Sequence, residues 1–455
     1  MGEANALRLA EPDRSGFGHP ENLIDIKCDA RKARTIKSSR LLATSDTPDP
    51  GSWEDAMTIN RLVLIAAAAL LTASPALAAD DILTIGFTVS RTGKLNNDSI
   101  AQMRGFELWR DELNDKGGIS VGGKQYKINF MSYDDESVNA RVQQLYTRLI
   151  NQDKAQFLFS PYSSGLVASA AIVSEQYGRI MLTTGAAEEK TYKLGNKNLF
   201  QVYSSADRYL VGAIETVKEL NPNARVALVY KDDPFSKAVL QSARKQVGEA
   251  GLRTVLDEAY SPETTDFGPV INKIISAKAD VLLGGGHYPD GATLARQIYD
   301  HKAGLKWLTL LVAPDSPNFA TMGDAAIGVT VPSQWEPQVS FKPDFGPTAA
   351  DFTQRFHAKY GIEPGYHAAG GYTAGLILQR AIEQAGSPEQ AKVAAVLNGM
   401  DATTMFGRTK FSTDPKEHGL QTGHEMVIAQ WQKKSGALFK AVIWPKAART
   451  SDIVY

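Results

Sequence analysis

The stretch from Phe157 to Glu189, FLFSPYSSGLVASAAIVSEQYGRIMLTTGAAEE, predicts two strand–helix units in succession. A short apolar run, Phe157-Leu158-Phe159, leads into a loop of small and hydroxyl residues, and an alanine-rich helix is expected from about Leu166 to Tyr177. The next predicted strand, Ile180-Met181-Leu182, also ends in small residues. Ligands of open parallel sheets bind at the carboxyl ends of the strands, so these two loops predict a ligand pocket.

The residues of the two loops indicate what the pocket holds. Ser163, Ser164, Thr183 and Thr184 supply hydroxyls without filling the space. The helix N-termini that follow the loops offer free N–H groups and a positive dipole end to an anion. Serine and threonine also serve as ordinary N-caps, and for any single residue that interpretation stays open. Two such loops on adjacent strands together favour a carboxylate or phosphate pocket.

The same strand–helix alternation occurs twice along the chain. A chain of 455 residues is too long for one core, so two lobes are expected. One series covers residues 82–203 and a second covers residues 226–316, each typical of an α/β lobe with a parallel sheet. The chain then returns with two helices and a hairpin-like pair of strands. The predicted returning elements are Pro347–Tyr360, Tyr366–Ala385, Val427–Trp431 and Phe439–Trp444. Gly370, Gly371 and Gly375 predict close packing of the second returning helix.

The N-terminal part contains an export signal in an unusual position. Residues 57–78 contain Arg61, a continuous run of ten apolar residues from Leu62 to Leu71 and the site Ala76-x-Ala78, in the order of a secretory signal peptide. The apolar run is about half the length of a membrane span. Residues 1–56 lack periodicity, so we expect translation to start at Met57, with cleavage near Ala78 and residues 1–56 as an over-extended start.

The composition excludes several classes of function. Removal of residues 1–78 takes away nine basic and ten acidic residues and leaves 40 of each, so neither nucleic acid nor an anionic membrane is expected as a partner. Cys28 is the only cysteine. The exported chain therefore has no disulfide, thiol catalysis, cysteine metal site or lipidated cysteine. A freely soluble exported protein indicates a periplasm.

No motif of an enzyme or a cofactor site stands out. Gly284-Gly285-Gly286 lacks the Lys-Ser/Thr ending of a phosphate-binding loop and the spacing of a dinucleotide fingerprint, so backbone clearance is the preferred interpretation. The histidines lack metal spacing, and no G-x-S-x-G elbow is present. We expect no cofactor, no metal and no enzymatic activity.

Acidic and aromatic residues near the strand ends are the remaining candidates. Asp315 and Asp207 each follow a predicted strand, where an aspartate is usually a turn or cap residue. Facing hydroxyls from the other lobe, such a carboxylate could bind the ammonium of an amino acid. Aromatic residues beside the same loops could line an apolar slot, although each is more often core or rim. They are Tyr162, Phe235, His287, Tyr288 and Trp335.

A series of segments along the chain has a recognisable order and spacing. They are Ile85-Gly-Phe-Thr with Gly93, Asn114–Ile119, Tyr133–Asp135, Tyr162–Ser164, Met181–Gly185, Asp232–Ser236, Gly284–Gly286 and Ala313–Asp315. Taken in order, these segments resemble the type I periplasmic substrate-binding proteins of ABC importers, in the leucine/isoleucine/valine-binding family, and the resemblance covers residues 81–445.

The resemblance implies two Rossmann-like lobes joined by three crossover segments, with a ligand enclosed by hinge closure. The crossings are expected near Ser204–Asp207, Pro332–Gln334 and Met405–Lys410. The first lobe would comprise residues 81–204 and 334–405, and the second residues 205–333 and 406–445. The implied ligand contacts are Tyr162, Ser163, Ser164, Gly185, Ala186, Ala187, Asp207, Phe235, His287 and Asp315.

The resemblance also implies roles for single residues. Ser163 and the backbone at Gly185 would hold the carboxylate and ammonium of an amino acid, Asp315 matches the acidic ammonium partner, and Asp207 is a nearby acid. The chain departs from the family at Ala187, where amino-acid binders carry a carboxylate-binding threonine, and at His287, which could accept a more polar or anionic group.

We therefore expect a monomeric periplasmic protein that captures an amino acid, of branched-chain type, or a related small carboxylate and delivers it to an ABC permease in the inner membrane. The alternative is a sensor that binds an aromatic acid, urea or a short amide and reports to a regulator. An enzyme is the third interpretation and lacks a recognisable catalytic cluster.

Overall fold

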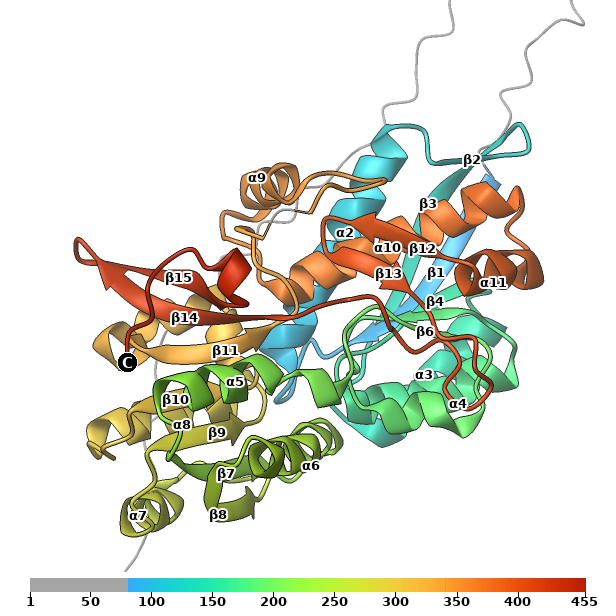
Figure 1. The fold of residues 1–455 in the computed structure, drawn as a ribbon. Coiled ribbons are helices and arrows are strands. Elements are labelled where there is room, and N and C mark those ends of the chain that lie inside the picture. Colours follow the sequence, from blue (N-terminus) through green and yellow to red (C-terminus); the bar gives the residue numbers. More distant parts are fainter. Residues whose placement is uncertain (1–80, 340) are drawn as a thin grey trace, which may run out of the picture. The chain divides into compact units, whose positions relative to one another are not determined.

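The computed structural model describes residues 81–339 and 341–455. The predicted N-terminal extension and signal peptide, residues 1–56 and 57–78, lie outside the described residues. The described part forms two α/β lobes, as Figure 1 shows, and the predicted fold class is confirmed. None of its helices is long and apolar enough to cross a membrane.

The first lobe contains a six-stranded sheet in which every neighbouring pair is parallel except β2 and β3. In spatial order its strands are β2 (Ile119–Val121), β3 (Lys124–Asp134), β1 (Asp81–Val89), β4 (Phe157–Phe159), β5 (Met181–Thr183) and β6 (Leu199–Gln201). Its helices are α2 (Asn96–Asp115), α3 (Asn139–Asn151), α4 (Ser164–Gln176), α9 (Ala349–Tyr360), α10 (Tyr366–Ala385) and α11 (Gln390–Asn398).

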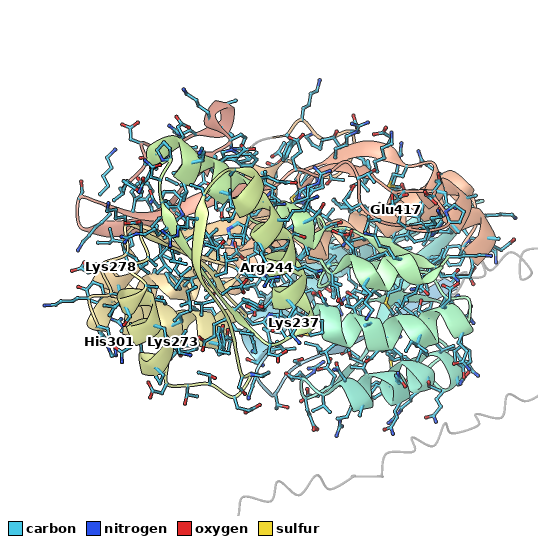
Figure 2. The ribbon with its side chains drawn as sticks, turned by 60° about the horizontal axis from the view of Figure 1, so that its bottom comes forward. Lys237, Arg244, Lys273, Lys278, His301 and Glu417 are labelled. Atoms are coloured by element: carbon cyan, nitrogen blue, oxygen red, sulfur yellow. The ribbon has the colours of Figure 1, made fainter. Side chains whose placement is uncertain are left out.

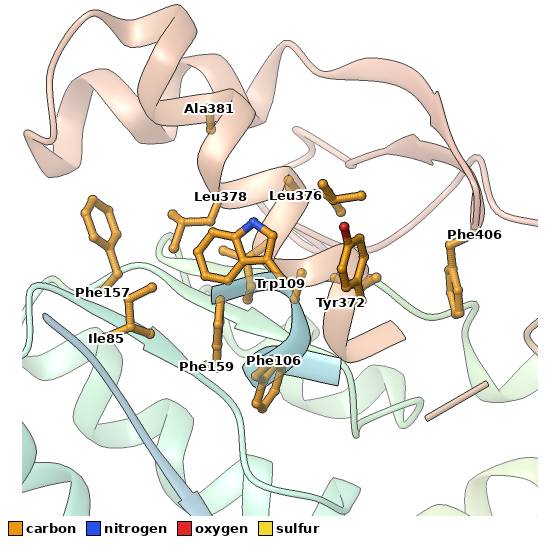
Figure 3. Close-up of a cluster of buried hydrophobic side chains, with 14 of the residues drawn as sticks. Ile85, Phe106, Trp109, Phe157, Phe159, Tyr372, Leu376, Leu378, Ala381 and Phe406 are labelled. Carbon is orange, nitrogen blue, oxygen red and sulfur yellow. The ribbon is translucent and has the colours of Figure 1, made fainter. Parts of the chain in front are cut away.

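Strand β4 is buried on both faces because helices cover both sides of the sheet. Successive side chains of a strand point to opposite faces. Phe157 and Phe159 accordingly pack against α2 and α10, whereas Leu158 packs against α3 and α4. Figure 3 shows the first of these cores, with Phe157 and Phe159 near Trp109. The apolar run that predicted this strand is thus explained by its central position in a parallel sheet.

Helices α2 and α10 cross at very short distance because glycines lie at their contact. A Cβ at Gly375 would overlap the indole of Trp109, and a Cβ at Gly371 would overlap the carbonyl oxygen of Gln102. The prediction that the glycines of this helix serve close packing is confirmed. The contact anchors α10, whose chain returns from the second lobe, to the first lobe.

The second lobe contains a seven-stranded sheet that is parallel except at β14 and β15. In spatial order its strands are β15 (Ala437–Trp444), β14 (Val427–Lys434), β11 (Val329–Ser333), β10 (Trp307–Leu310), β9 (Val281–Gly285), β7 (Arg225–Lys231) and β8 (Arg253–Tyr260). Its helices are α5 (Val211–Leu220), α6 (Pro234–Glu249), α7 (Gly268–Ser276) and α8 (Tyr288–Asp300).

Charged pairs protect the edge strand β8. Arg244 of α6 forms a salt bridge with Asp257, and Lys273 of α7 forms one with Glu258. Figure 2 labels both basic residues. Charged side chains on an edge strand oppose pairing with another chain.

Three crossings between the lobes lie side by side and are hydrogen-bonded to one another. Ser204 lies on the first, Gln334 on the second and His424 on the third. The amide of Ser204 donates to Oε1 of Gln334 at 2.9 Å, and the Ser204 hydroxyl donates to the carbonyl of His424, also at 2.9 Å. Nε2 of His424 lies 2.8 Å from the carbonyl oxygen of Gln334. The three segments therefore form one connected hinge.

The predicted position of the third crossing, Met405–Lys410, is wrong. These residues belong to a small hairpin of the first lobe, formed by β12 (Asp401–Thr404) and β13 (Gly407–Lys410). Phe406 and Phe411 are buried in the core of the first lobe, and the carbonyl of Gly419 accepts a hydrogen bond from Gln201 of β6. The chain crosses only at residues 421–426, so residues 406–420 pack with the first lobe rather than the second.

Candidate ligand-binding site

In each lobe the site lies at the point where the spatial order of the strands changes direction. In the first lobe the order reverses between β1 and β4, and in the second lobe it reverses between β7 and β9. Ligands of open α/β sheets bind at the carboxyl ends of strands at such points. Tyr162 follows β4, Phe235 follows β7 and His287 follows β9, so each of these residues lies at a reversal point.

Side-chain hydroxyls of the loop after β4 bind backbone amides of the loop after β5. Ser163 is the N-cap of α4. The hydroxyl of Ser164 accepts hydrogen bonds from the amides of Ala187 and Glu188, both at 3.3 Å. Ser164 therefore orders the second loop, while the Ser163 side chain is buried next to it.

Gly185 allows the two loops to approach closely. A Cβ at this position would lie 2.7 Å from the carbonyl oxygen of Pro161 and 2.9 Å from Oε1 of Gln102. The same Gln102 donates from Nε2 to the carbonyl of Ser160 at 2.8 Å. A larger residue at 185 would push the loop after β5 away from the site.

Glycine has a structural role in the second lobe as well. A Cβ at Gly284 would overlap the carbonyl oxygen of Val229 on the neighbouring strand β7. The interpretation of this glycine run as backbone clearance is confirmed at this position. It lets β9 run close to β7, and the chain then reaches His287, the N-cap of α8, two residues after the strand ends.

A hydrogen bond between His287 and Tyr162 joins the two lobes. The Tyr162 hydroxyl lies 2.9 Å from Nδ1 of His287, and both side chains are buried. Nε2 of His287 lies 3.4 Å from Oδ2 of Asp233, the N-cap of α6, whose Oδ1 accepts from the amide of Ser236 at 2.8 Å. Burial opposes the charge of His287, but Asp233 raises the pKa of the imidazole above its usual value.

A small cavity of about 10 Å³ lies around this hydrogen bond, enough for about one water molecule. Five predicted residues line it: Tyr162, Gly185, Ala187, Phe235 and His287. Four lining residues were not predicted: Tyr203, Tyr209, Tyr366 and His367. The first two come from the first crossing and the others from the first turn of α10, so segments far apart in sequence enclose the site.

Two of the unpredicted residues hold polar atoms without hydrogen-bond partners among the described residues. They are the hydroxyl of Tyr203 and Nε2 of His367. Tyr203 is 2 % exposed and His367 is 3 % exposed. Buried polar groups almost always have partners, so unsatisfied ones at a cavity indicate where a ligand can bind.

The structure does not bring the two predicted aspartates to the cavity. Oδ1 of Asp315 lies 3.2 Å from Nζ of Lys440, and its Oδ2 accepts from the amide of Tyr366 at 3.1 Å. Lys440 also lies 2.7 Å from Oε1 of Glu336. The side chain of Asp207 is exposed on the first crossing. Asp315 thus lies behind the start of α10, neutralised by a buried lysine.

Asp98 is a further acid near the site that sequence reasoning missed. It lies in the first turn of α2 and is 2 % exposed. Its Oδ2 lies 3.4 Å from the amide of Tyr288 in the second lobe, and its Oδ1 accepts from the side chain of Asn97 at 2.9 Å. An aspartate in the first turn of a helix is common because it complements the helix dipole, so this position alone does not indicate a binding role.

Comparisons with known proteins identify the family. A family profile described as periplasmic binding protein matches residues 82–437. The Leu/Ile/Val-binding protein BraC3 of Rhizobium johnstonii is 26 % identical over 354 residues, which cover 77 % of this chain and 92 % of BraC3.

Solved structures share the fold. LivJ of Streptococcus pneumoniae, solved with isoleucine, has a TM-score of 0.67 and 21 % identity and covers 80 % of this chain and 100 % of LivJ. A solute-binding protein of Rhodopseudomonas palustris, solved with 3,4-dihydroxybenzoic acid, has a TM-score of 0.68 and 18 % identity and covers 83 % of this chain and 99 % of that protein. The predicted resemblance is confirmed, and this chain belongs to the periplasmic binding protein family.

Proposed function

We propose that this protein is the solute-binding component of an ABC importer. It captures an amino acid of branched-chain type, or a related small carboxylate, between its lobes and delivers it to a permease in the inner membrane. The observation that carries the proposal is the cavity lined from both lobes. There the Tyr162 hydroxyl and Nδ1 of His287 lie 2.9 Å apart, beside the hinge formed by the three crossings. A solute bound there is enclosed when the lobes close.

The hinge supports capture by closure. Opening the lobes separates Tyr162 from His287, whereas the bonds among Ser204, Gln334 and His424 can persist because these residues lie on the crossings themselves. The relatives support transport, since LivJ is a branched-chain amino acid transporter substrate-binding protein and was solved with isoleucine.

The proposal includes the location and the form of the protein. Export through a signal peptide cleaved near Ala78 would deliver a monomer to the periplasm, with translation starting at Met57. Family membership supports the periplasm. The intact mass of the exported protein tests the rest, and a mature N-terminus upstream of residue 70 would contradict it.

We also propose that the protein carries its solute unchanged rather than acting as an enzyme. The basis is family membership, because the relatives named above are binding proteins. Mass spectrometry of the solute recovered after prolonged incubation is the direct check. A converted product would require a catalytic role for the Tyr162–His287–Asp233 arrangement.

A thermal-shift panel on protein beginning at Ala79 tests the binding function. The panel contains the L-amino acids, benzoate-type acids, urea and small amides, with calorimetry for each hit. A solute that binds only the folded state must raise the melting temperature, by an amount that grows with its concentration. A panel without any saturable stabilisation would contradict the proposal.

A further inference from the structure

Two histidines from different lobes flank the ring of Tyr162. The ring of His287, from the start of α8, lies 5.4 Å from that of Tyr162, and the ring of His367, from the first turn of α10, lies 4.9 Å from it. Both histidines are 3 % exposed and both line the cavity. Each lobe therefore contributes one imidazole to the cavity.

Each imidazole is backed by a buried carboxylate on the nitrogen that is not directed at the cavity. Nε2 of His287 lies 3.4 Å from Asp233, and Nδ1 of His367 lies 3.6 Å from Oδ2 of Asp315. A carboxylate behind a histidine fixes the orientation of the ring, and the imidazolium form of such a histidine donates from its cavity-facing nitrogen as well. The other nitrogens are Nδ1 of His287, next to the Tyr162 hydroxyl, and Nε2 of His367, which has no partner among the described residues.

The surroundings suit an anion better than an ammonium group. The residues that line the cavity include no Asp or Glu among those described. Three nearby carboxylates each have one bonded oxygen: Asp315 binds Lys440, Asp233 accepts from the amide of Ser236, and Asp98 accepts from the amide of Tyr288. The other oxygen of Asp233, Oδ2, has no hydrogen-bond partner among the described residues and lies 3.4 Å from Nε2 of His287. An ammonium group carries only donors, and the described residues that line the cavity offer it no carboxylate to balance its charge.

The rest of the lining is apolar or aromatic. Phe235 lies 5.6 Å from His287 and 5.3 Å from Tyr209, measured between ring centroids. Ala187 adds a methyl group where a hydroxyl would give a further polar contact. The apolar part of a ligand can therefore be enclosed by rings while its charged end meets the histidines.

We propose that this site selects an apolar carboxylate that lacks an ammonium group. When the lobes part, the Tyr162–His287 bond breaks, and the ligand carboxylate bridges the lobes by accepting from both residues. Nε2 of His367 and the hydroxyl of Tyr203 bind its remaining acceptor positions. This inference rests on the proposed function, in that a solute binds between the lobes.

Calorimetry with matched pairs of ligands tests the selection on protein beginning at Ala79. The pairs are hydrocinnamate with L-phenylalanine and isocaproate with L-leucine, which differ only by the ammonium group, and benzoate is added as an aryl acid. We expect the acid of at least one pair to bind about tenfold tighter than its amino acid. The inference is overturned if the amino acids bind as tightly as the acids or more tightly and Asp98→Asn abolishes that binding. The proposed function would remain intact in that case.

Variants test the two imidazoles separately. His287→Gln and His367→Gln should each weaken binding of the preferred acid about tenfold or more, whereas His357→Gln, at an exposed histidine of α9, should leave the affinity unchanged. If His287→Gln fails to fold, Tyr162→Phe replaces it, and this variant should also weaken binding of the preferred acid. Unchanged affinity in the folded variants overturns the inference, and absence of binding by all members of the panel overturns the proposed function with it.

Discussion

Two buried polar regions meet at the start of α10 and differ in how completely they are bonded. One is the buried charge cluster of Asp315, Glu336 and Lys440, in which the lysine lies within 3.2 Å of both acids. The other is the cavity, where the Tyr203 hydroxyl and Nε2 of His367 have no partner among the described residues. The two acids of the cluster are as buried as Tyr203 and His367, and Lys440 is partly buried. The state of the hydrogen bonds distinguishes a part of the scaffold from a place for a ligand.

The electrostatics agree with this distinction. Burial would raise the pKa of Asp315, but Lys440 and His367 hold it below its usual value. Burial likewise opposes the charge of Lys440, whose pKa the two carboxylates raise to about 12. Asp315 and Lys440 are therefore charged at neutral pH and stabilise each other rather than a ligand, whereas burial raises the pKa of the third member, Glu336.

The largest expected effect comes from breaking the charge cluster. Lys440→Met leaves two buried carboxylates without their cation and should reduce the free energy of unfolding by about 3–5 kcal/mol. Urea unfolding monitored by tryptophan fluorescence measures the loss. Lys433→Met, at an exposed lysine of the neighbouring strand β14, is the control and should change little. A loss for Lys440→Met no larger than that of the control would mean that the cluster is not a stabilising unit.

The second effect is a pH dependence that originates in the hinge. Burial lowers the pKa of His424 to about 4, against about 6.5 in an unfolded chain. Below the unfolded pKa, the unfolded chain gains a proton that folded His424 does not bind. Stability should therefore fall as the pH falls from about 6.5 to 4, by about 3 kcal/mol.

His287 contributes with the opposite sign, because its pKa is raised in the folded protein. Its stabilisation is present at low pH and is lost as the pH rises through its folded pKa. The comparison of wild type with His424→Gln isolates the hinge histidine. Urea unfolding from pH 7 to 4.5 should show a weaker dependence in the variant, and identical slopes would disprove the assignment.

The third prediction separates binding from stability at the cavity. Tyr203→Phe removes a hydroxyl without a partner, so stability should be unchanged while the affinity for the solute falls about tenfold. Tyr146→Phe is the matched opposite, because the Tyr146 hydroxyl donates to the carbonyl of Phe159 at 2.6 Å in the core of the first lobe. It should lower stability and leave affinity nearly unchanged. If Tyr203→Phe and Tyr146→Phe change stability and affinity in the same way, the bonding state of a buried hydroxyl does not distinguish the scaffold from the ligand site.

The smallest effect is expected at the rim of the cleft. Lys94 of the first lobe forms an exposed ion pair with Glu263 of the second, beside the carbonyl of Pro262. Exposed pairs contribute little and are screened by salt. Lys94→Ala should therefore change the affinity less than about threefold at low ionic strength, and by nothing at high salt. A larger loss would make the rim part of the binding site.

The sequence predicted the lining residues that follow β4, β5, β7 and β9, and it missed Tyr203 after β6 and the two residues from α10. Buried parallel strands have a clear apolar signature, and the position of their loops at the sheet edge follows from topology. Tyr162 and His287 could thus be found. Tyr366 and His367 come from a helix that returns after the whole second lobe, and an aromatic residue at a helix start has the same pattern as a core residue.

The missed partners and the missed crossing have the same physical origin in contacts between distant residues. Asp315 had the position of an ammonium ligand, but its cation, Lys440, lies 125 residues away in sequence. The resemblance implied a crossing at Met405–Lys410, but Phe406 and Phe411 bury this segment in the first lobe. Local patterns predict elements, whereas pairing between distant residues depends on the packed structure.

The distance between the lobes tests the central claim most directly. Cys28 is the only cysteine of the chain, so protein beginning at Ala79 can carry spin labels at Lys94→Cys and Glu263→Cys alone. The account predicts a broad distribution of distances without solute and a single short distance with the saturating solute found by calorimetry. The same distribution with and without that solute would contradict capture between the lobes.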